Sequence, residues 1–432
     1  MATATSRSRF PSVKRIPIAR TPPDLPIPAA FRCPISLDLM KDPVTLPTGI
    51  TYDRQSIEAW LELGNLTCPV TNQALGDELD LVPNHAIRRM IQDWCVANRS
   101  LGVERIPTPR IPANPVQVSD LLSDVSLSAR CRDHGRCGEL VRKLKALGRE
   151  SERNRRCIVS GGAGLVLSTC FSELYDGNRA GLADDILSAL VAFLPLDEDS
   201  CRQLALPKSL DAIVSSLKSS DLEGRVNAAL VLKELASSVP PSRADAIART
   251  DGLIEALVRL IEKPISPRVT KAAMVAAFYL VAASERTAAR FAEAGIVPLL
   301  LETIADSERS MCEKALGVLD GVMSCRSGRE KAAGHALAVP VLVKKLLRVS
   351  DFATEFAVSG LWKLCKNDDR EGMCSTEALG VGAFQKLLLL LQVGCGGATK
   401  DKASELLKLL NRFRGSSECI ETVDIRGLKR SF

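Results

Sequence analysis

Small and large apolar residues recur in register through the C-terminal two thirds of the chain. A small residue starts each block, at Ala183, Ala228, Ala272, Ala315, Ala357 and Ala403. Four positions later come Leu187, Leu232, Ala276, Leu319, Leu361 and Leu407. Seven positions later come Leu190, Leu235, Tyr279, Val322, Leu364 and Leu410. Offsets of zero, four and seven lie on one face of an α-helix, so each block is predicted to be a helix with one buried stripe.

A second apolar column precedes the first and predicts another helix in every block. These helices open near Gly164, Leu210, Ile254, Val297, Val339 and Phe384. A turn glycine stands before four of them, at Gly162, Gly252, Gly295 and Gly382. A period of about 40–47 residues with two or three helices is typical of armadillo and HEAT arrays. The glycine-led helix resembles the armadillo unit, which implies an all-α solenoid of about six repeats over residues 136–414; a non-repetitive helical domain is the alternative.

The N-terminal part of the chain has a different organisation. Residues 1–25 are basic and rich in Ser, Thr and Pro, so we expect a disordered tail, with a second tail at 415–432. Residues 26–101 read as a compact domain, and 102–135 as a proline-rich linker with a helical lead-in. The linker contains Pro107, Pro109, Pro112 and Pro115.

Two short helices are predicted inside the 26–101 domain. The first follows Asp53 as its N-cap and ends at Gly64, with Ile57, Trp60 and Leu61 on its apolar face. Asn84 is predicted to cap the second helix. Its buried stripe is expected to comprise Ile87, Met90, Ile91 and Trp94.

Two loops that each begin with Cys-Pro flank the first helix. Each loop lacks the second cysteine that a zinc site would need. A RING finger would place cysteine three positions after Cys33 and after Cys68, whereas this chain has Ser36 and Thr71. Two isolated thiols cannot complete tetrahedral zinc sites, so no metal is expected. Side-chain hydrogen bonds are expected to hold the loops instead. Candidates are Ser36, Asp38, Asp42, Thr45, Thr71 and Asn72.

Over about 75 residues this block resembles the U-box, the zinc-free, RING-like α+β module, and with the repeats it resembles the plant U-box ubiquitin ligases. The resemblance implies transfer of ubiquitin from a ubiquitin-conjugating enzyme to a substrate lysine, without a cofactor or a covalent catalytic residue in this chain. It places conjugating-enzyme binding at Ile35, Leu37 and Pro69, with Trp60 as a wall. The alternatives are that Ile35 and Leu37 are core residues, and that the protein is a non-enzymatic armadillo scaffold with an inactive U-box.

One further position is implied by the resemblance. Many ligases of this class place a cation after the second loop to hold ubiquitin against the conjugating enzyme. The corresponding residue here is Asn72. An amide lacks the charge and the bidentate geometry of arginine, so we expect weaker positioning of ubiquitin. Asn72 could instead brace its own turn.

The repeats imply a groove for an unidentified protein substrate. Its predicted residues are Lys233, Asp320, Trp362, Lys366, Lys408 and Arg412. A nuclear-import adaptor would show a ladder of Trp and Asn in these columns, and this chain has one Trp and no Asn there. Because the groove is mixed in charge, the substrate cannot be named from it.

Composition narrows the partners further. The net charge is +6 and aromatic residues make up 4% of the chain, so nucleic acid is not expected as a partner. No apolar run is long enough to predict a membrane span, and no hydrophobic block marks a secretion signal. Cysteines among aliphatic residues indicate a reducing compartment, the cytoplasm or the nucleus. Cys131, His134 and Cys137 have metal-like spacing, but no fourth ligand stands nearby.

Overall fold

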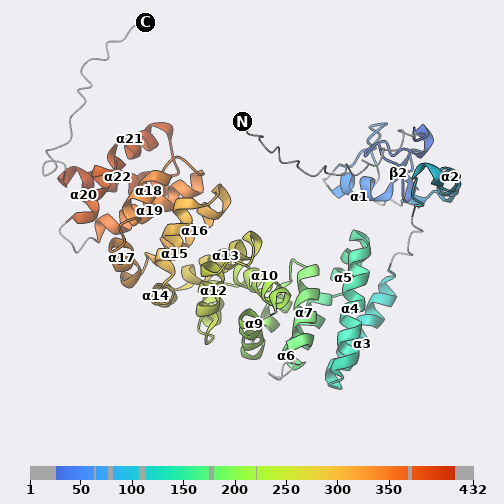
Figure 1. Ribbon diagram of the computed structural model, residues 1–432, viewed down its shortest axis with the longest axis horizontal. Coiled ribbons are helices and arrows are strands. Elements are labelled where there is room, and N and C mark those ends of the chain that lie inside the picture. Colours follow the sequence, from blue (N-terminus) through green and yellow to red (C-terminus); the bar gives the residue numbers. More distant parts are fainter. Residues whose placement is uncertain are drawn as a thin grey trace, which may run out of the picture. The chain divides into compact units, whose positions relative to one another are not determined.

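The computed structural model describes residues 26–62, 65–75, 81–106, 113–174, 180–219, 221–367 and 372–413. The chain forms two compact units, Met1–Ile111 and Pro112–Phe432, which we call the N-terminal unit and the repeat unit (Figure 1). The predicted tails, Gly64 and three of the four linker prolines lie outside the described residues. The fourth, Pro115, is the first residue of a helix.

The N-terminal unit contains a small antiparallel sheet with strand order β2-β1-β3. Val44 in β1 pairs with Tyr52 in β2 on one side and with Pro83 in β3 on the other. The elements are η1 (Ala29–Phe31), β1 (Pro43–Thr45), β2 (Thr51–Asp53), α1 (Arg54–Glu62), β3 (Val82–Pro83), α2 (His85–Ala97) and η2 (Arg99–Leu101).

The two predicted helices of this unit are present, with one error in the predicted core. The Asn84 side chain accepts a hydrogen bond from the Ile87 amide (3.0 Å), so the predicted cap of α2 is confirmed. Ile91 is buried and Met90 is 54% exposed, so Met90 was wrongly placed in the core. Cys95 takes the next inward position on α2, four residues after Ile91, as helical spacing requires.

The repeat unit is built from helices alone in its described residues. A pair, α3 and α4, precedes six triplets. The helices are α3 (Pro115–Arg130), α4 (His134–Glu150), α5 (Glu152–Ser160), α6 (Ala163–Leu174), α7 (Ala180–Ala192), α8 (Glu198–Leu204), α9 (Pro207–Lys218), α10 (Leu222–Ser238), α11 (Pro241–Ala248), α12 (Leu253–Glu262), α13 (Pro267–Ala283), α14 (Glu285–Glu293), α15 (Ile296–Asp306), α16 (Arg309–Val322), α17 (Arg326–Ala333), α18 (Ala338–Lys345), α19 (Asp351–Lys366), α20 (Met373–Gly380), α21 (Ala383–Val393) and α22 (Gly397–Phe413).

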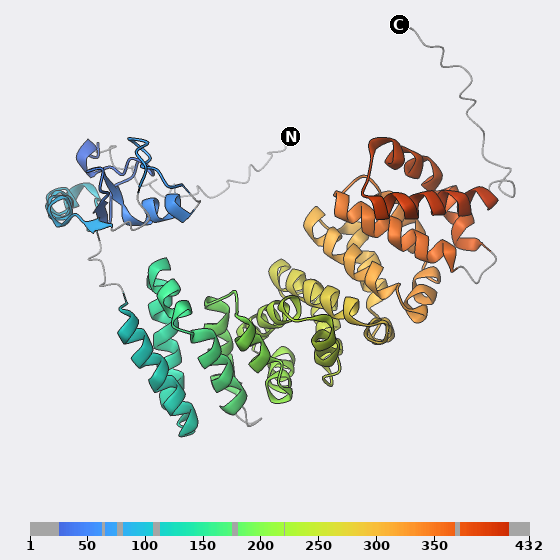
Figure 2. The same cartoon turned by 180° about the vertical axis from the view of Figure 1, so that it is seen from behind.

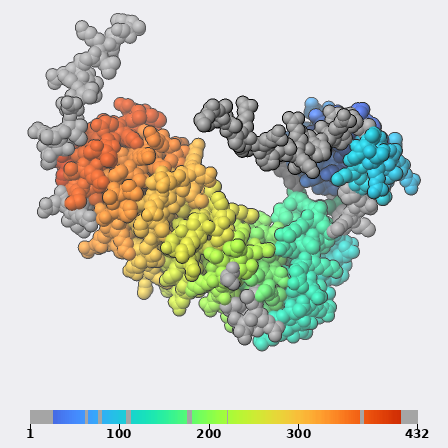
Figure 3. Space-filling model, in the orientation of Figure 1, coloured from blue at the N-terminus to red at the C-terminus, as the bar shows by residue number. Residues whose placement is uncertain are grey.

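Helix α4 and the third helices of the six triplets form one layer along the repeat unit. Each contacts the next, in the order α4, α7, α10, α13, α16, α19 and α22. The stacking is visible from both sides (Figures 1 and 2), and the space-filling surfaces of successive triplets follow one another without a break (Figure 3). We call the exposed side of this layer the third-helix face.

The predicted stripe of these helices is confirmed with two exceptions. All six small residues that start the stripe are buried. Tyr279 is 40% exposed, and its neighbour Leu280 occupies the core position. In α22 Leu406 is fully buried in place of Leu407, which is half-buried. In α13 the bulky phenol of Tyr279 moves the buried stripe by one residue. In α22, the last helix of the described residues, one side is uncovered, and the stripe is again displaced by one residue.

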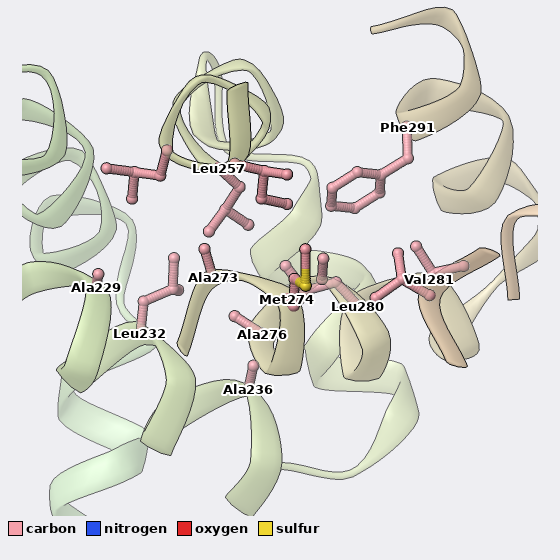
Figure 4. Close-up of a cluster of buried hydrophobic side chains, with 14 of the residues drawn as sticks. Ala229, Leu232, Ala236, Leu257, Ala273, Met274, Ala276, Leu280, Val281 and Phe291 are labelled. Carbon is pink, nitrogen blue, oxygen red and sulfur yellow. The ribbon is translucent and has the colours of Figure 1, made fainter. Parts of the chain in front are cut away.

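Small side chains let neighbouring third helices approach closely. Ala229, Leu232 and Ala236 of α10 lie opposite Ala273 and Ala276 of α13 in one buried cluster (Figure 4). The close-up also shows larger side chains from α12 and α14, including Leu257 and Phe291, above this contact. Burying one leucine-sized side chain contributes about 1.5–3 kcal/mol, so the repeated layer is stabilised mainly by aliphatic packing.

The predicted turn glycines are required by their backbone. Gly252, Gly295 and Gly382 have φ of +75°, +83° and +82° and precede α12, α15 and α21. Side chains rarely tolerate this left-handed region, whereas glycine enters it freely. The glycines therefore turn the chain from the first helix of a triplet into the second.

No single helix in the described ranges has both the length and the apolar composition to cross a bilayer. Two bent pairs, Glu152–Ser160 with Ala163–Leu174 and Met373–Gly380 with Ala383–Val393, meet those criteria jointly.

Candidate functional site

The two Cys-Pro loops of the N-terminal unit share one backbone structure. Single antiparallel bridges close them, Arg32 with Leu39 and Thr67 with Ala74. The Leu37 amide donates to the Cys33 carbonyl (2.9 Å), and the Asn72 amide donates to the Cys68 carbonyl at the same distance. We call the exposed side of these two loops the two-loop surface.

The apex residues of both loops adopt a left-handed backbone. Leu37 has φ of +62° and Asn72 has φ of +54°. Asparagine tolerates this region, while leucine pays a steric penalty of about 1–2 kcal/mol. A strained leucine that is also 64% exposed is not a core residue. The core interpretation of Leu37 is therefore wrong.

The two thiols at the RING ligand positions are fully buried and accept hydrogen bonds. The Cys33 sulfur accepts from the Asp53 amide (3.3 Å). The Cys68 sulfur lies 3.1 Å from the Tyr52 hydroxyl and accepts from the Thr48 hydroxyl (3.4 Å). Protein donors thus surround each sulfur where a RING finger would hold zinc.

These donors change the acidity of Cys68. Burial by itself raises the pKa of the thiol, but hydrogen bonds from Thr48, Thr71 and Tyr52 outweigh burial and lower the pKa to about 6. Burial and the Cys68 thiol raise the pKa of Tyr52. The Tyr52 hydroxyl therefore remains protonated and can donate to the sulfur.

A carboxylate network fixes the first loop against α1. Asp53 Oδ1 accepts the amides of Lys41 (2.7 Å) and Asp42 (2.8 Å), so the side chain holds the loop and does not cap the helix as predicted. Arg54 Nε donates to Asp42 Oδ2 (2.6 Å), and Arg88 lies 3.6 Å from Asp42 Oδ1. Asp53 was misread because its partners lie 11 and 12 residues away along the chain.

Four of the six predicted loop-holding side chains form the expected kind of bond. Ser36 accepts the Asp38 amide, Thr71 accepts the Gln73 amide, and Thr45 lies 2.9 Å from the Thr51 hydroxyl. Asp42 is the fourth. Asn72 is exposed, and the hydrogen bond that it forms within the described residues is donated by its backbone amide, to the Cys68 carbonyl.

The predicted docking residues occupy different depths. Leu37 is exposed, whereas Ile35, Pro69 and Trp60 are half-buried. Ile35 and Trp60 pack against the core of the unit. Trp60 Nε1 donates to the Thr67 carbonyl (2.9 Å), so this side chain ties α1 to the start of the second loop.

Sequence reasoning missed Val70. It occupies the second loop where Ile35 occupies the first, and it is 54% exposed. The equivalence of the segments starting at Cys33 and Cys68, 35 residues apart, was a signal that could have identified it. Leu37 and Val70 together give the two-loop surface an exposed apolar side chain on each loop.

Among the predicted groove residues, Trp362 and Lys366 come together on the third-helix face. Lys366 Nζ lies 4.5 Å from the centre of the Trp362 ring. Trp362 Nε1 donates to Glu405 Oε2 (2.8 Å), and Lys366 lies 3.0 Å from Glu405 Oε1. Hydrogen bonds from Lys366 and then Trp362 lower the pKa of Glu405, and Lys408 adds to this shift.

In the described part of the chain the other predicted groove residues make no ion pair, hydrogen bond or ring contact with Trp362 or Lys366, although Lys408 lies near enough to Glu405 to lower its pKa. Asp320 pairs with Lys363 (2.8 Å), and Lys233 lies 3.8 Å from Glu234. Lys408 and Arg412 are exposed on α22. Lys363 and Glu405, which sequence reasoning missed, supply the cross-helix partners of Asp320 and Trp362.

An aromatic contact crosses the middle of the face. The Phe278 and Phe356 rings lie 5.9 Å apart, edge to face, although α16 separates their helices in sequence. A Cβ on Gly317 of α16 would lie 3.2 Å from both rings. Glycine at this position therefore provides the room for the two rings to meet.

Comparisons with known proteins identify both units. The U-box domain profile matches residues 27–100, and the plant U-box protein ARM repeat region profile matches residues 117–429. The second match covers more than half of the chain. The chain belongs to the family of plant U-box proteins with armadillo repeats. The N-terminal unit is hereafter the U-box unit and the repeat unit the armadillo unit.

Full-length relatives support this membership. U-box domain-containing protein 21 of Arabidopsis thaliana is 40% identical over 100% of this chain and 99% of its own length. E3 ubiquitin-protein ligase PUB23 of the same plant is 37% identical over 92% of this chain and 96% of its own length. The crystal structure of an engineered protein, 20% identical, covers 68% of each chain with a TM-score of 0.54, which supports the fold alone.

The metal-like spacing of Cys131, His134 and Cys137 does not produce a cluster. Cys137 is buried and Cys131 is exposed. In the described part of the chain no group of three or more His, Cys, Asp or Glu side chains is placed to hold a metal ion.

Proposed function

We propose that this protein is a ubiquitin ligase whose two-loop surface docks a ubiquitin-loaded conjugating enzyme. The observation that carries the proposal is the pair of exposed apolar side chains, Leu37 and Val70, on two loops held by hydrogen bonds to the buried sulfurs of Cys33 and Cys68. Preorganised loops lose little conformational entropy on binding, so a shallow apolar contact suffices. Relatives named E3 ubiquitin-protein ligase support the activity.

The chain contributes positioning and supplies no covalent chemistry in this proposal. The conjugating enzyme carries ubiquitin as a thioester, and a substrate lysine attacks it. Ile35, Leu37, Pro69 and Val70 would hold the enzyme, and Asn72 would contact ubiquitin or the enzyme beside it. Holding the partners in a reactive geometry accelerates transfer by reducing its entropic cost.

The third-helix face is proposed to present the substrate. Trp362 offers an indole flanked by Lys366 and Lys402, whose Nζ atoms lie 4.5 and 5.8 Å from the ring centre. Glu405 adds an acceptor beside them. A partly exposed aromatic residue among charged groups is typical of an interaction hot spot.

The test measures docking and catalysis with the full chain. Leu37→Ala and Val70→Ala should each weaken binding of a cognate conjugating enzyme by about 1–2 kcal/mol and slow ubiquitin discharge. Met90→Ala is the matched control, because Met90 is as exposed as Val70, at 54%, but belongs to α2 and to neither loop. Equal loss in the control, or full activity in both loop variants, would contradict the docking site. Absence of chain formation by the wild type would favour an inactive scaffold.

A further inference from the structure

A basic pocket lies where α15 turns into α16 and α18 turns into α19. Its volume is about 240 Å³. The lining residues are Ser307, Arg309, Cys312, Lys344, Lys345, Arg348 and Val349. Four of these seven side chains are cations and none is a carboxylate. The helices involved lie side by side in the orange part of the ribbon (Figure 1).

Among the described residues the charge of this pocket is not balanced by ion pairs, although the carboxylates of Asp351 and Glu355 line the cavity that shares Arg309 and Arg348 with it. Within the described ranges the structure contains no ion pair for Arg309, Lys344, Lys345 or Arg348. The nearest acid in sequence to Arg309, Glu308, is engaged elsewhere, because it lies 2.6 Å from Lys271 of α13. Lys345 Nζ donates to the Ala305 carbonyl (3.5 Å) and also interacts with the Cys312 thiol, so its contacts are to groups without a formal charge.

Two further features raise the positive potential at the pocket. Lys386 donates to the Val343 carbonyl (2.7 Å) at the end of α18, and Arg348 is close enough to lower the pKa of Lys386, after the larger effect of burial. Helix α16 begins at Arg309, and its N-cap residue makes no side-chain hydrogen bond to the first turn. No N-cap side chain bonds to the positive end of this 14-residue helix, whose first residue, Arg309, is one of the cations.

A second, larger cavity of about 710 Å³ adjoins the basic pocket. The two share Arg309, Arg348 and Val349. Its lining combines apolar side chains, Leu347, Leu390 and Val393, with the backbone around Gly394 and the carboxylates of Asp351 and Glu355. An anion is therefore favoured in the small pocket, and the large cavity offers an apolar contact at Leu347, Leu390 and Val393 beside two carboxylates.

We propose that this pair of cavities binds a phosphorylated peptide segment of a partner protein. Two arginines and two lysines can make charge-assisted hydrogen bonds to a phosphate, and arginine can do so with two parallel bonds. The apolar part of the adjoining cavity, at Leu347, Leu390 and Val393, accepts a neighbouring side chain of the same peptide, which a free phosphate or an isolated headgroup would not fill. Binding of the peptide does not depend on the proposed function; only ubiquitination of the bound partner does. The test therefore measures binding in the absence of ubiquitin transfer.

The probe is a fluorescein-labelled peptide pool with phosphoserine at its centre and degenerate flanks, alongside the same pool with serine. In fluorescence anisotropy at physiological salt, the full chain should bind the phosphoserine pool at least about tenfold more tightly. Inorganic phosphate should compete. The double variant Arg309→Gln with Arg348→Gln should lose the preference.

The matched control has the same charge change at a distance from the cavities. Arg259→Gln with Arg268→Gln alters two exposed arginines that line neither cavity and should keep the preference. Equal binding of both pools, or equal loss in the control pair, would overturn the proposal. Phosphoinositide vesicles are a further arm: dependence on Arg309 and Arg348 for vesicles, without a phosphopeptide preference, would assign the site to a lipid headgroup and contradict a peptide.

Discussion

The U-box unit and the armadillo unit are stabilised by different interactions. The U-box unit has strands of two or three residues and two irregular loops, so polar groups such as the half-buried Asp53 and the buried Cys33 and Cys68 must hold its backbone. The armadillo unit repeats one helix triplet, and alanines and leucines fill the contacts between triplets. Specific polar contacts therefore hold the unit that is proposed to dock the conjugating enzyme. Repeated aliphatic packing holds the unit that is proposed to present the substrate.

The largest expected effect is local to the armadillo unit. A Cβ at Gly328 would lie 2.1 Å from the Val322 carbonyl oxygen, a backbone atom that cannot move aside. Gly328→Ala should therefore lower the free energy of unfolding of this unit by more than about 2 kcal/mol. Trp362 fluorescence during urea unfolding, in a Trp60→Phe, Trp94→Phe background, reports this unit.

The control for this variant is Gly181→Ala. Nothing lies within 4 Å of a Cβ at Gly181 in α7, so alanine there should be neutral or stabilising. Unchanged stability of Gly328→Ala would show that the fifth triplet adapts more readily than its packing indicates.

Loss of the Asp53 carboxylate should lower the stability of the U-box unit by a comparable amount. Asp53→Ala leaves the Lys41 and Asp42 amides without their acceptor, which should lower the stability of this unit by about 1–3 kcal/mol and reduce ubiquitin chain formation. Asp38→Ala is the control, because Asp38 is exposed on the first loop. Urea unfolding followed by Trp60 and Trp94 in a Trp362→Phe background measures the difference. Equal effects at Asp38 and Asp53 would remove the proposed distinction between the units.

The stability of the U-box unit should depend on pH through Cys68. The pKa of its thiol is about 6 in the folded state and about 8.5 in an unfolded chain, so the folded state holds fewer protons between these values. Linkage then makes stability rise with pH across this window, be complete above about pH 9 and be lost as pH falls through 6. The same fluorescence assay from pH 5.5 to 9 tests this, and Cys68→Ser should flatten the slope. An unchanged slope in that variant would assign the dependence to another group.

The smallest expected effect concerns Asn72. Its left-handed backbone already explains why asparagine stands at this position, so two variants are needed to separate the effect of the backbone from that of the side chain. Asn72→Gly keeps the backbone and removes the amide, and should slow single-turnover discharge of the conjugating enzyme a few-fold. Asn72→Arg should speed discharge with little change in Kd, despite about 1 kcal/mol of backbone cost. If Asn72→Gly discharges at the wild-type rate, Asn72 is a turn residue alone.

Sequence predicted the armadillo unit more fully than the U-box unit for a physical reason. Helix periodicity is local, so the stripe that starts at Ala183 and ends at Leu410 could be read directly, apart from the one-residue shifts at Tyr279 and Leu407. The bonds of Asp53 and the donors around Cys68 join residues 11 to 20 positions apart without a periodic pattern. The two Cys-Pro loops were located from their motifs, but the exposure of Val70 and Leu37 depends on tertiary contacts.

The central claim is that a metal-free two-loop surface supports ubiquitin transfer. The most direct test is ubiquitin chain formation by the purified full chain with a cognate conjugating enzyme, after extended treatment with EDTA. The sulfurs of Cys33 and Cys68, which would be zinc ligands in a RING finger, accept hydrogen bonds from the protein instead. The treated protein should therefore form chains at the same rate as the untreated protein. Activity that is lost on chelation and restored by zinc would contradict the account.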